Sequence, residues 1–169
     1  RKYYDMCKDV VERPPGREDE FSDATTPDRN RILNEILSLE TESEEDIMGV
    51  IAAYYGMVRF LDDGIGQILD ALERLNLREN TIVIFCSDHG DFMGEHGMQC
   101  KGGVFYDCLT RVPLIASWPG HVPEGVVDES MVNLIDIVPT LLHLQGMDIP
   151  RSMHGKGLPT VTDAEPRDA

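Results

Sequence analysis

The chain has 169 residues, with 31 acidic and 15 basic side chains and a formal net charge of −16. This length allows one domain with a hydrophobic core, and 41% hydrophobic with 27% charged residues is typical of a globular protein. The negative charge argues against nucleic acid or a membrane surface as a partner, because both favour basic proteins. No run of about 18 apolar residues is present, so no membrane-spanning helix is predicted.

Residues 1–46 form an acidic, proline-containing segment that we expect to be largely irregular, with a short helix near residues 29–39. Its acidic clusters are interpreted as solvated surface. The segment lacks the apolar core of a signal peptide and does not begin with Met, so we expect further sequence upstream.

A long helix is predicted next, because apolar residues recur at alternating steps of three and four. Ser43, followed three residues later by Asp46, resembles a capping box, and Asn76 is a suitable end. A helix lying across a sheet is the preferred interpretation, and a coiled coil is the alternative. The apolar positions are Ile47, Ile51, Tyr54, Val58, Leu61, Ile65, Ile68, Leu72 and Leu75.

The β-branched and apolar run at residues 81–87 predicts a buried central strand of a parallel sheet, in which Cys86 is a buried apolar residue. Residues 112–118 predict another short strand, and residues 131–135 a further one. Asp136 is expected to cap a helix over residues 137–145, which Gly146 ends.

This order of elements indicates an α/β fold with a layered, mostly parallel sheet flanked by helices. The expected organisation is an irregular acidic segment at 1–46, the main domain at 47–157 and a polar tail at 158–169.

Asp88 and His89 follow the strongest predicted strand, at the strand end where α/β sheets gather ligand groups. A carboxylate and an imidazole at such a turn can bind one divalent cation. Taken alone, Asp-His-Gly is a weak signal that favours a helix cap beside a hydrogen-bonded histidine.

Several segments in order resemble the sulfatase family of the alkaline-phosphatase-like superfamily, over about residues 47–157. The central one, from Asn80 to Met98, reads NTIVIFCSDHGDFMGEHGM and is similar to the family's C-terminal metal-ligand segment. The others are YGMVRFLDDGIGQILDAL at 55–72, Lys101, Tyr106, RVPLI at 111–115, WPG at 118–120, NLIDIVPTLL at 133–142 and HGK at 154–156.

The resemblance implies that Asp88 and His89 are metal ligands, for calcium or for manganese or magnesium, and that Lys101 contacts the sulfate oxygens. His96 is a weaker candidate for lining the substrate site. Structural roles are favoured for Arg111, Asp62, Asp63, Asp136 and Tyr106, and His121, His143 and His154 show no sign of a ligand role.

The family's nucleophile is formylglycine, made from Cys or Ser in a C/S-x-P/A-x-R motif, and none of Cys7, Cys86, Cys100 or Cys108 lies in one. The paired N-terminal aspartates and the small C-terminal sheet domain of the family also have no counterpart. We therefore expect the C-terminal part of a sulfatase catalytic domain, inactive alone, with formylglycine upstream and a sulfated small molecule or glycan as substrate.

Two alternatives remain open at this point. A phosphonate monoester or phosphodiester hydrolase of the same superfamily would use the same Asp-His pair, and fold alone does not decide between the esters. A non-catalytic acidic α/β interaction module would explain the missing nucleophile.

Overall fold

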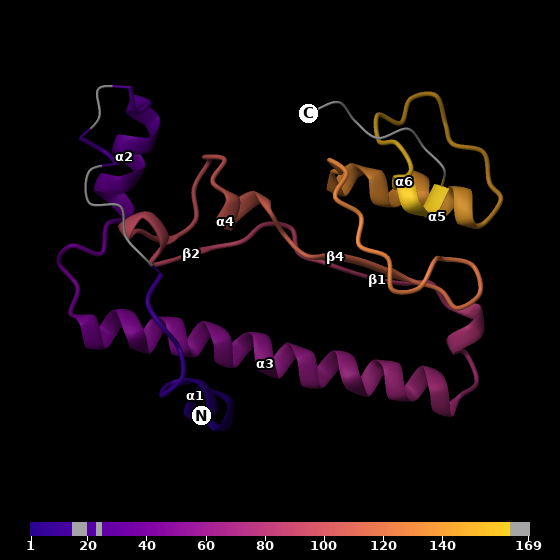
Figure 1. Cartoon of the computed structure of the whole chain (residues 1–169), viewed down its shortest axis with the longest axis horizontal. Helices are drawn as coiled ribbons and strands as arrows, with labels where there is room; N and C mark the ends of the chain where they lie inside the picture. Colours follow the sequence, from indigo (N-terminus) through magenta and orange to yellow (C-terminus); the bar gives the residue numbers. More distant parts are fainter. Residues whose placement is uncertain (15–19, 23–24, 163–169) are drawn as a thin grey trace. The chain divides into compact units, whose positions relative to one another are not determined.

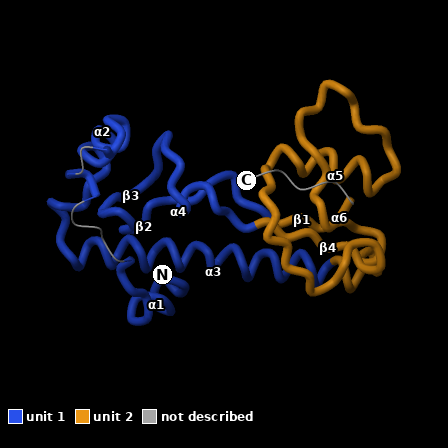
Figure 2. The backbone as a smooth tube through the Cα atoms, turned by 45° about the horizontal axis from the view of Figure 1, so that its top comes forward, with its two compact units in different colours: residues 1–71, 86–113 blue, residues 72–85, 114–169 orange. Residues whose placement is uncertain are grey.

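The computed structural model describes residues 1–14, 20–22 and 25–162, and the chain divides into two compact units. Unit 1 comprises residues 1–71 and 86–113, and unit 2 comprises residues 72–85 and 114–169 (Figure 2). Within the described residues, no helix is long and apolar enough to cross a bilayer. The chain is α/β, as the sequence predicts.

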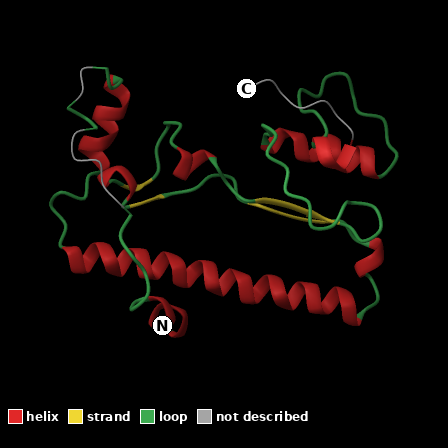
Figure 3. Ribbon diagram, in the orientation of Figure 1, coloured by secondary structure: helices red, strands yellow, loops and turns green. Residues whose placement is uncertain are grey.

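The predicted long helix is confirmed as α3 (Glu44–Arg74), a single helix of 31 residues (Figure 3). The Ser43 hydroxyl accepts a hydrogen bond from the backbone N–H of Asp46 at 3.1 Å, which caps the first turn. Asn76 has a φ of 54°, a left-handed conformation that ends helices and that asparagine tolerates. The capping residues on both sides of the helix are therefore those that the sequence indicates.

The N-terminal segment adds two helices to unit 1, α1 (Lys2–Cys7) and α2 (Asp28–Leu37). Helix α1 lies beside α3 (Figure 1), where the Tyr3 hydroxyl donates to Asp63 Oδ2 at 2.8 Å. Helix α2 begins one residue before the predicted range and ends two residues before its end. The described part of the acidic segment thus contains two helices and contacts the rest of unit 1.

The residues that follow Asp91 form a small hairpin in unit 1. Strands β2 (Phe92–Met93) and β3 (Gln99–Cys100) pair antiparallel, with Phe92 opposite Cys100. The 3-10 helix η2 (Glu95–Gly97) connects them, and α4 (Asp107–Thr110) follows. Two clusters of buried apolar side chains lie here. The hairpin and α4 enclose the first, which comprises Phe92, Met98, Val104 and Leu109. The start of α3 forms the second, which comprises Leu39, Ile47 and Ile51.

Strands β1 (Val83–Cys86) and β4 (Leu114–Ser117) fall inside the two predicted strand segments and pair in a two-stranded sheet. A buried central strand needs neighbours and cover on both faces, and among the described residues this sheet has two strands only. Phe85 and Cys86 are accordingly exposed, so the expectation of a buried Cys86 is wrong for this chain.

Unit 2 is completed by the 3-10 helices η1 (Arg78–Asn80) and η3 (Leu134–Asp136) and by α5 (Ile137–Leu144) and α6 (Pro159–Thr162). Helix α5 agrees with the prediction, but the strand expected at 131–135 is wrong, because those residues lead into η3. The buried Asp136 side chain does not cap α5. It accepts the backbone N–H groups of Asn133 and Lys156, each at 2.8 Å, and so joins η3 to the last described segment.

Candidate functional site

Asp88 leaves the end of β1 as an exposed carboxylate, with 84% of its side chain accessible. Its Oδ1 accepts the backbone N–H of His89 at 3.0 Å. This hydrogen bond, and then the charge of His89, hold the pKa of Asp88 below its ordinary value, with a small further effect of Lys101. Asp88 is therefore an ionised oxygen donor at neutral pH.

The His89 imidazole turns toward the same carboxylate. Its Nε2 lies 3.5 Å from Asp88 Oδ2, while its Nδ1 lies 2.9 Å from the carbonyl oxygen of Gly90. A cation would bind the neutral imidazole, in which the proton would lie on Nδ1 and be donated to that carbonyl, with the lone pair of Nε2 on the side of Asp88. An oxygen and a nitrogen at this separation fit two ligands of one cation, since bonds of about 2.0–2.1 Å to magnesium or about 2.3–2.6 Å to calcium could span it.

Gly90 fixes the turn that carries both side chains. Its N–H donates to the carbonyl of Leu109 in α4 at 2.9 Å. A Cβ at this position would lie 1.9 Å from the carbonyl oxygen of Cys108, so only glycine allows the two backbones to approach this closely. Helix α4 thereby holds the Asp88–His89 turn in place within unit 1.

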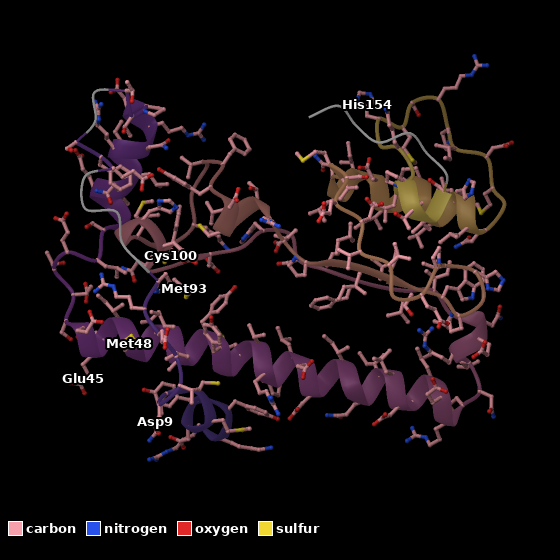
Figure 4. All side chains as sticks on the ribbon, in the orientation of Figure 1. Asp9, Glu45, Met48, Met93, Cys100 and His154 are labelled. Carbon is pink, nitrogen blue, oxygen red and sulfur yellow. The ribbon has the colours of Figure 1, made fainter. Side chains whose placement is uncertain are left out.

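Lys101 follows β3 directly, in the same unit as Asp88, and its side chain is exposed. Its charge contributes to the lowered pKa of Asp88, so the ammonium group acts electrostatically on the candidate metal ligand. Cys100, labelled beside Met93 in Figure 4, has a φ of 62° immediately before Lys101. A left-handed, non-glycine residue marks a tight change of direction of the chain at this point.

His96 lies in η2 and is partly buried, with 19% of its side chain exposed. Its Nδ1 lies 2.5 Å from Glu20 Oε2, and its ring lies against that of Tyr106 with centroids 4.1 Å apart. The Tyr106 hydroxyl accepts a hydrogen bond from Asn30 at 3.0 Å. His96 therefore reaches any ligand through Nε2 only, and the partly buried Tyr106 is hydrogen-bonded, as the sequence analysis favoured.

The structure thus brings Asp88 and His89 into contact and places Lys101 within their electrostatic reach. Within residues 1–14, 20–22 and 25–162, no group of three or more His, Cys, Asp or Glu side chains converges in a way that could hold a metal ion. Two donors make a weak metal site, and a tight site needs further ligands.

A model of the family described as Sulfatase matches residues 6–147. The chain belongs to the sulfatase family. A choline-sulfatase from Rhizobium meliloti (strain 1021) is 33% identical over 153 residues, which cover 88% of this chain and 29% of that protein. The chain therefore spans about a third of the length of this curated relative.

Solved structures agree with this membership and with the alkaline-phosphatase-like fold. A phosphonate monoester hydrolase from Silicibacter pomeroyi matches with a TM-score of 0.79 and 27% identity, over 96% of this chain and 34% of that one. BT1596, a 2-O GAG sulfatase, matches with a TM-score of 0.72 and 28% identity, over 94% of this chain and 37% of that one. Sulfatase-family members are hydrolases, so the chain is part of an enzyme family.

Two residues that contact the segments carrying His96 and Lys101 in this sulfatase-family chain were not indicated by the sequence. Glu20 was grouped with the solvated acidic clusters, yet it contacts His96. Arg29 was taken only as the start of a helix, yet it packs beside the segment that follows Lys101. Each contact joins residues more than 70 positions apart, and no local pattern could have indicated either.

Proposed function

We propose that this chain supplies part of the active site of a sulfuric ester hydrolase. The observation that carries the proposal is the 3.5 Å approach of His89 Nε2 to Asp88 Oδ2 beside the charge of Lys101. In the proposal, Asp88 and His89 are two ligands of a divalent cation. The carboxylate suits calcium or magnesium, and the imidazole extends the range to manganese.

Lys101 is proposed to contact the non-bridging oxygens of the ester as a compact positive charge on a flexible stem. Such a charge stabilises the transition state, in which negative charge on those oxygens increases. His96 is proposed to line the site through its Nε2. When bound, the cation would act as a Lewis acid and polarise the same ester group.

The nucleophile and the remaining ligands are proposed to come from a longer protein that contains this chain. A formylglycine upstream would supply the nucleophile, and β1 and β4 would belong to a larger, layered, mostly parallel sheet. The 169-residue chain alone is then expected to turn over no aryl sulfate. The substrate is proposed to be a sulfated small molecule or glycan, in line with the names of the choline-sulfatase and the GAG sulfatase.

A second candidate is a phosphonate monoester or phosphodiester hydrolase. It is favoured by the structural match to the phosphonate monoester hydrolase, and the same cation and lysine could serve either ester. Relative rates on an aryl sulfate and a phosphate diester, measured in a longer protein that carries this chain, would decide between them. There, Asp88→Ala and Lys101→Ala should each lower kcat by about 10² or more, since each removes transition-state stabilisation.

The metal ligands can be tested directly in the purified 169-residue chain by calorimetric titration with Mn²⁺ and Ca²⁺. We expect weak, saturable binding that Asp88→Asn and His89→Ala each weaken at least tenfold. His154→Ala, an exposed histidine of unit 2, is the matched control and should bind as the wild type does. Equal binding by the wild type and both site variants, or no binding by the wild type, would contradict the metal assignment.

A further inference from the structure

The peptide unit between His89 and Gly90 is held from both sides. The Ser87 hydroxyl donates a hydrogen bond to the carbonyl oxygen of His89 at 2.8 Å. On the opposite side of the same peptide plane, the N–H of Gly90 donates to the carbonyl oxygen of Leu109 in α4 at 2.9 Å. Because a peptide unit is planar, these two hydrogen bonds together fix its rotation about the chain.

This peptide unit determines where the His89 imidazole lies. The ring Nδ1 lies 2.9 Å from the carbonyl oxygen of Gly90, the next carbonyl along the chain. The position of that carbonyl depends on the two backbone torsions of Gly90, and a glycine restricts its own torsions least of all residues. No other residue fits here, since a Cβ would lie 1.9 Å from the carbonyl oxygen of Cys108. Hydrogen bonds from other residues must therefore supply the rigidity that the glycine lacks.

Ser87 supplies one of these hydrogen bonds from the strand end. The serine directly follows β1 and is partly buried. Bonds between serine hydroxyls and nearby backbone groups are common in turns, and by themselves they indicate no function. This bond differs in its acceptor, which is the carbonyl of a candidate metal ligand. Outer hydrogen bonds that orient a ligating histidine raise metal affinity, because the ring is already in place when the cation binds.

We propose that Ser87 is a positioning residue for the metal site. It acts through His89: by holding the His89 carbonyl, it keeps the ring Nε2 at 3.5 Å from Asp88 Oδ2, a separation that fits two ligands of one cation. The inference rests on the proposed function, in which Asp88 and His89 bind the cation. It adds a residue that does not touch the cation and that nonetheless determines how tightly the cation binds.

The test is calorimetric titration of the full 169-residue chain with Mn²⁺ and with Ca²⁺. Ser87→Ala is expected to weaken Mn²⁺ binding about tenfold, the lower end of what the loss of such an outer hydrogen bond costs. Ca²⁺ binding should weaken less, because calcium prefers oxygen ligands and depends less on the imidazole. Ser87→Thr keeps the hydroxyl and should bind Mn²⁺ as the wild type does. The control Ser43→Ala removes the hydroxyl that caps α3 and should leave both affinities unchanged.

A double-mutant cycle separates positioning from a general loss of structure. In the His89→Ala background, Ser87→Ala should change the Mn²⁺ affinity no further, because the ring through which the serine acts is gone. Wild-type Mn²⁺ affinity in Ser87→Ala, or an equal loss in both backgrounds, would overturn the role of Ser87 and leave the metal assignment standing on His89→Ala. No Mn²⁺ binding by the wild type would overturn the metal assignment of the proposed function, and the role of Ser87 with it.

Discussion

Glu20 and His96 are 76 residues apart in sequence and are joined by a contact of 2.5 Å between Oε2 and Nδ1. Both side chains are mostly buried, with 15% and 19% exposed. His96 has a φ of 56°, which a non-glycine residue adopts only where its surroundings hold it. The pair therefore ties the N-terminal segment to the turn that precedes β3 and Lys101.

Glu20→Gln is expected to lower the free energy of unfolding by about 1–2 kcal/mol, because it weakens a charge-assisted hydrogen bond in a partly buried place. Chemical denaturation would measure this change, with exposed Glu40→Gln as the control. The coupling should appear in a double-mutant cycle with His96→Gln. Additive effects of the two substitutions would show that the contact contributes nothing to stability.

Gly90→Ala is expected to destabilise the chain by about 1–3 kcal/mol, because the added Cβ would overlap the carbonyl oxygen of Cys108 and force the backbones apart. The control is Gly64→Ala within α3, where a Cβ would meet nothing within 4 Å. That substitution should stabilise the helix by up to about 1 kcal/mol. Thermal unfolding of the two variants should thus shift in opposite directions, and a Gly90→Ala chain as stable as the wild type would disprove the close contact.

The helices were the most predictable part of this fold, because their signals are local. The apolar spacing from Ile47 to Leu75 and the Ser43 cap depend on near neighbours along the chain, and α3 follows them. Gly146, with a φ of 67°, marks the end of α5 for the same reason. The sheet was less predictable. Burial of β1 depends on neighbouring strands, and these come from residues distant in the sequence.

The residues of the candidate site also differ in whether a local sequence signal indicated them. The approach of Asp88 to His89 follows from their adjacency at a strand end, and residue types alone indicated it. The place of Lys101 was expected from the family resemblance only. The contacts of Glu20 with His96 and of Arg29 with Gly103 depend on tertiary packing, and the acidic surroundings of Glu20 pointed to solvent instead.

Cys108 is expected to resist alkylation, because burial first and the charge of Glu95 second raise the pKa of its thiol to about 11. At pH 8 only about one thiol in a thousand would then be the reactive thiolate. Iodoacetamide should modify the exposed Cys86 and Cys100 well before Cys108, as peptide mass spectrometry would show. Equal labelling of Cys100 and Cys108 in the folded chain would contradict the burial of the Cys108 thiol.

Asp128 should make the free energy of unfolding of unit 2 depend on pH in the acidic range. Its carboxylate accepts the backbone N–H of Ser130 at 2.8 Å and that of Thr160 at 3.2 Å, and also the Thr160 hydroxyl. The hydrogen bonds from Ser130 and then from Thr160 lower its pKa to about 2 from an ordinary 3.8. Because the folded value is the lower one, the stabilisation is present above about pH 4 and is lost as the pH falls toward 2.

Asp128→Asn should therefore reduce stability at pH 6 and reduce it less at pH 3, where the wild-type carboxylate has already lost part of its advantage. Urea denaturation would give the free energy of unfolding of the wild type and of Asp128→Asn at each pH. Subtracting the two values at the same pH removes the contribution of the other carboxylates, which titrate in both proteins. Asp148→Asn, at an exposed position of the same unit, is the control and should change stability little at either pH. A difference between the wild type and Asp128→Asn that is the same at pH 6 and pH 3 would show that the contacts of Asp128 do not depend on its charge.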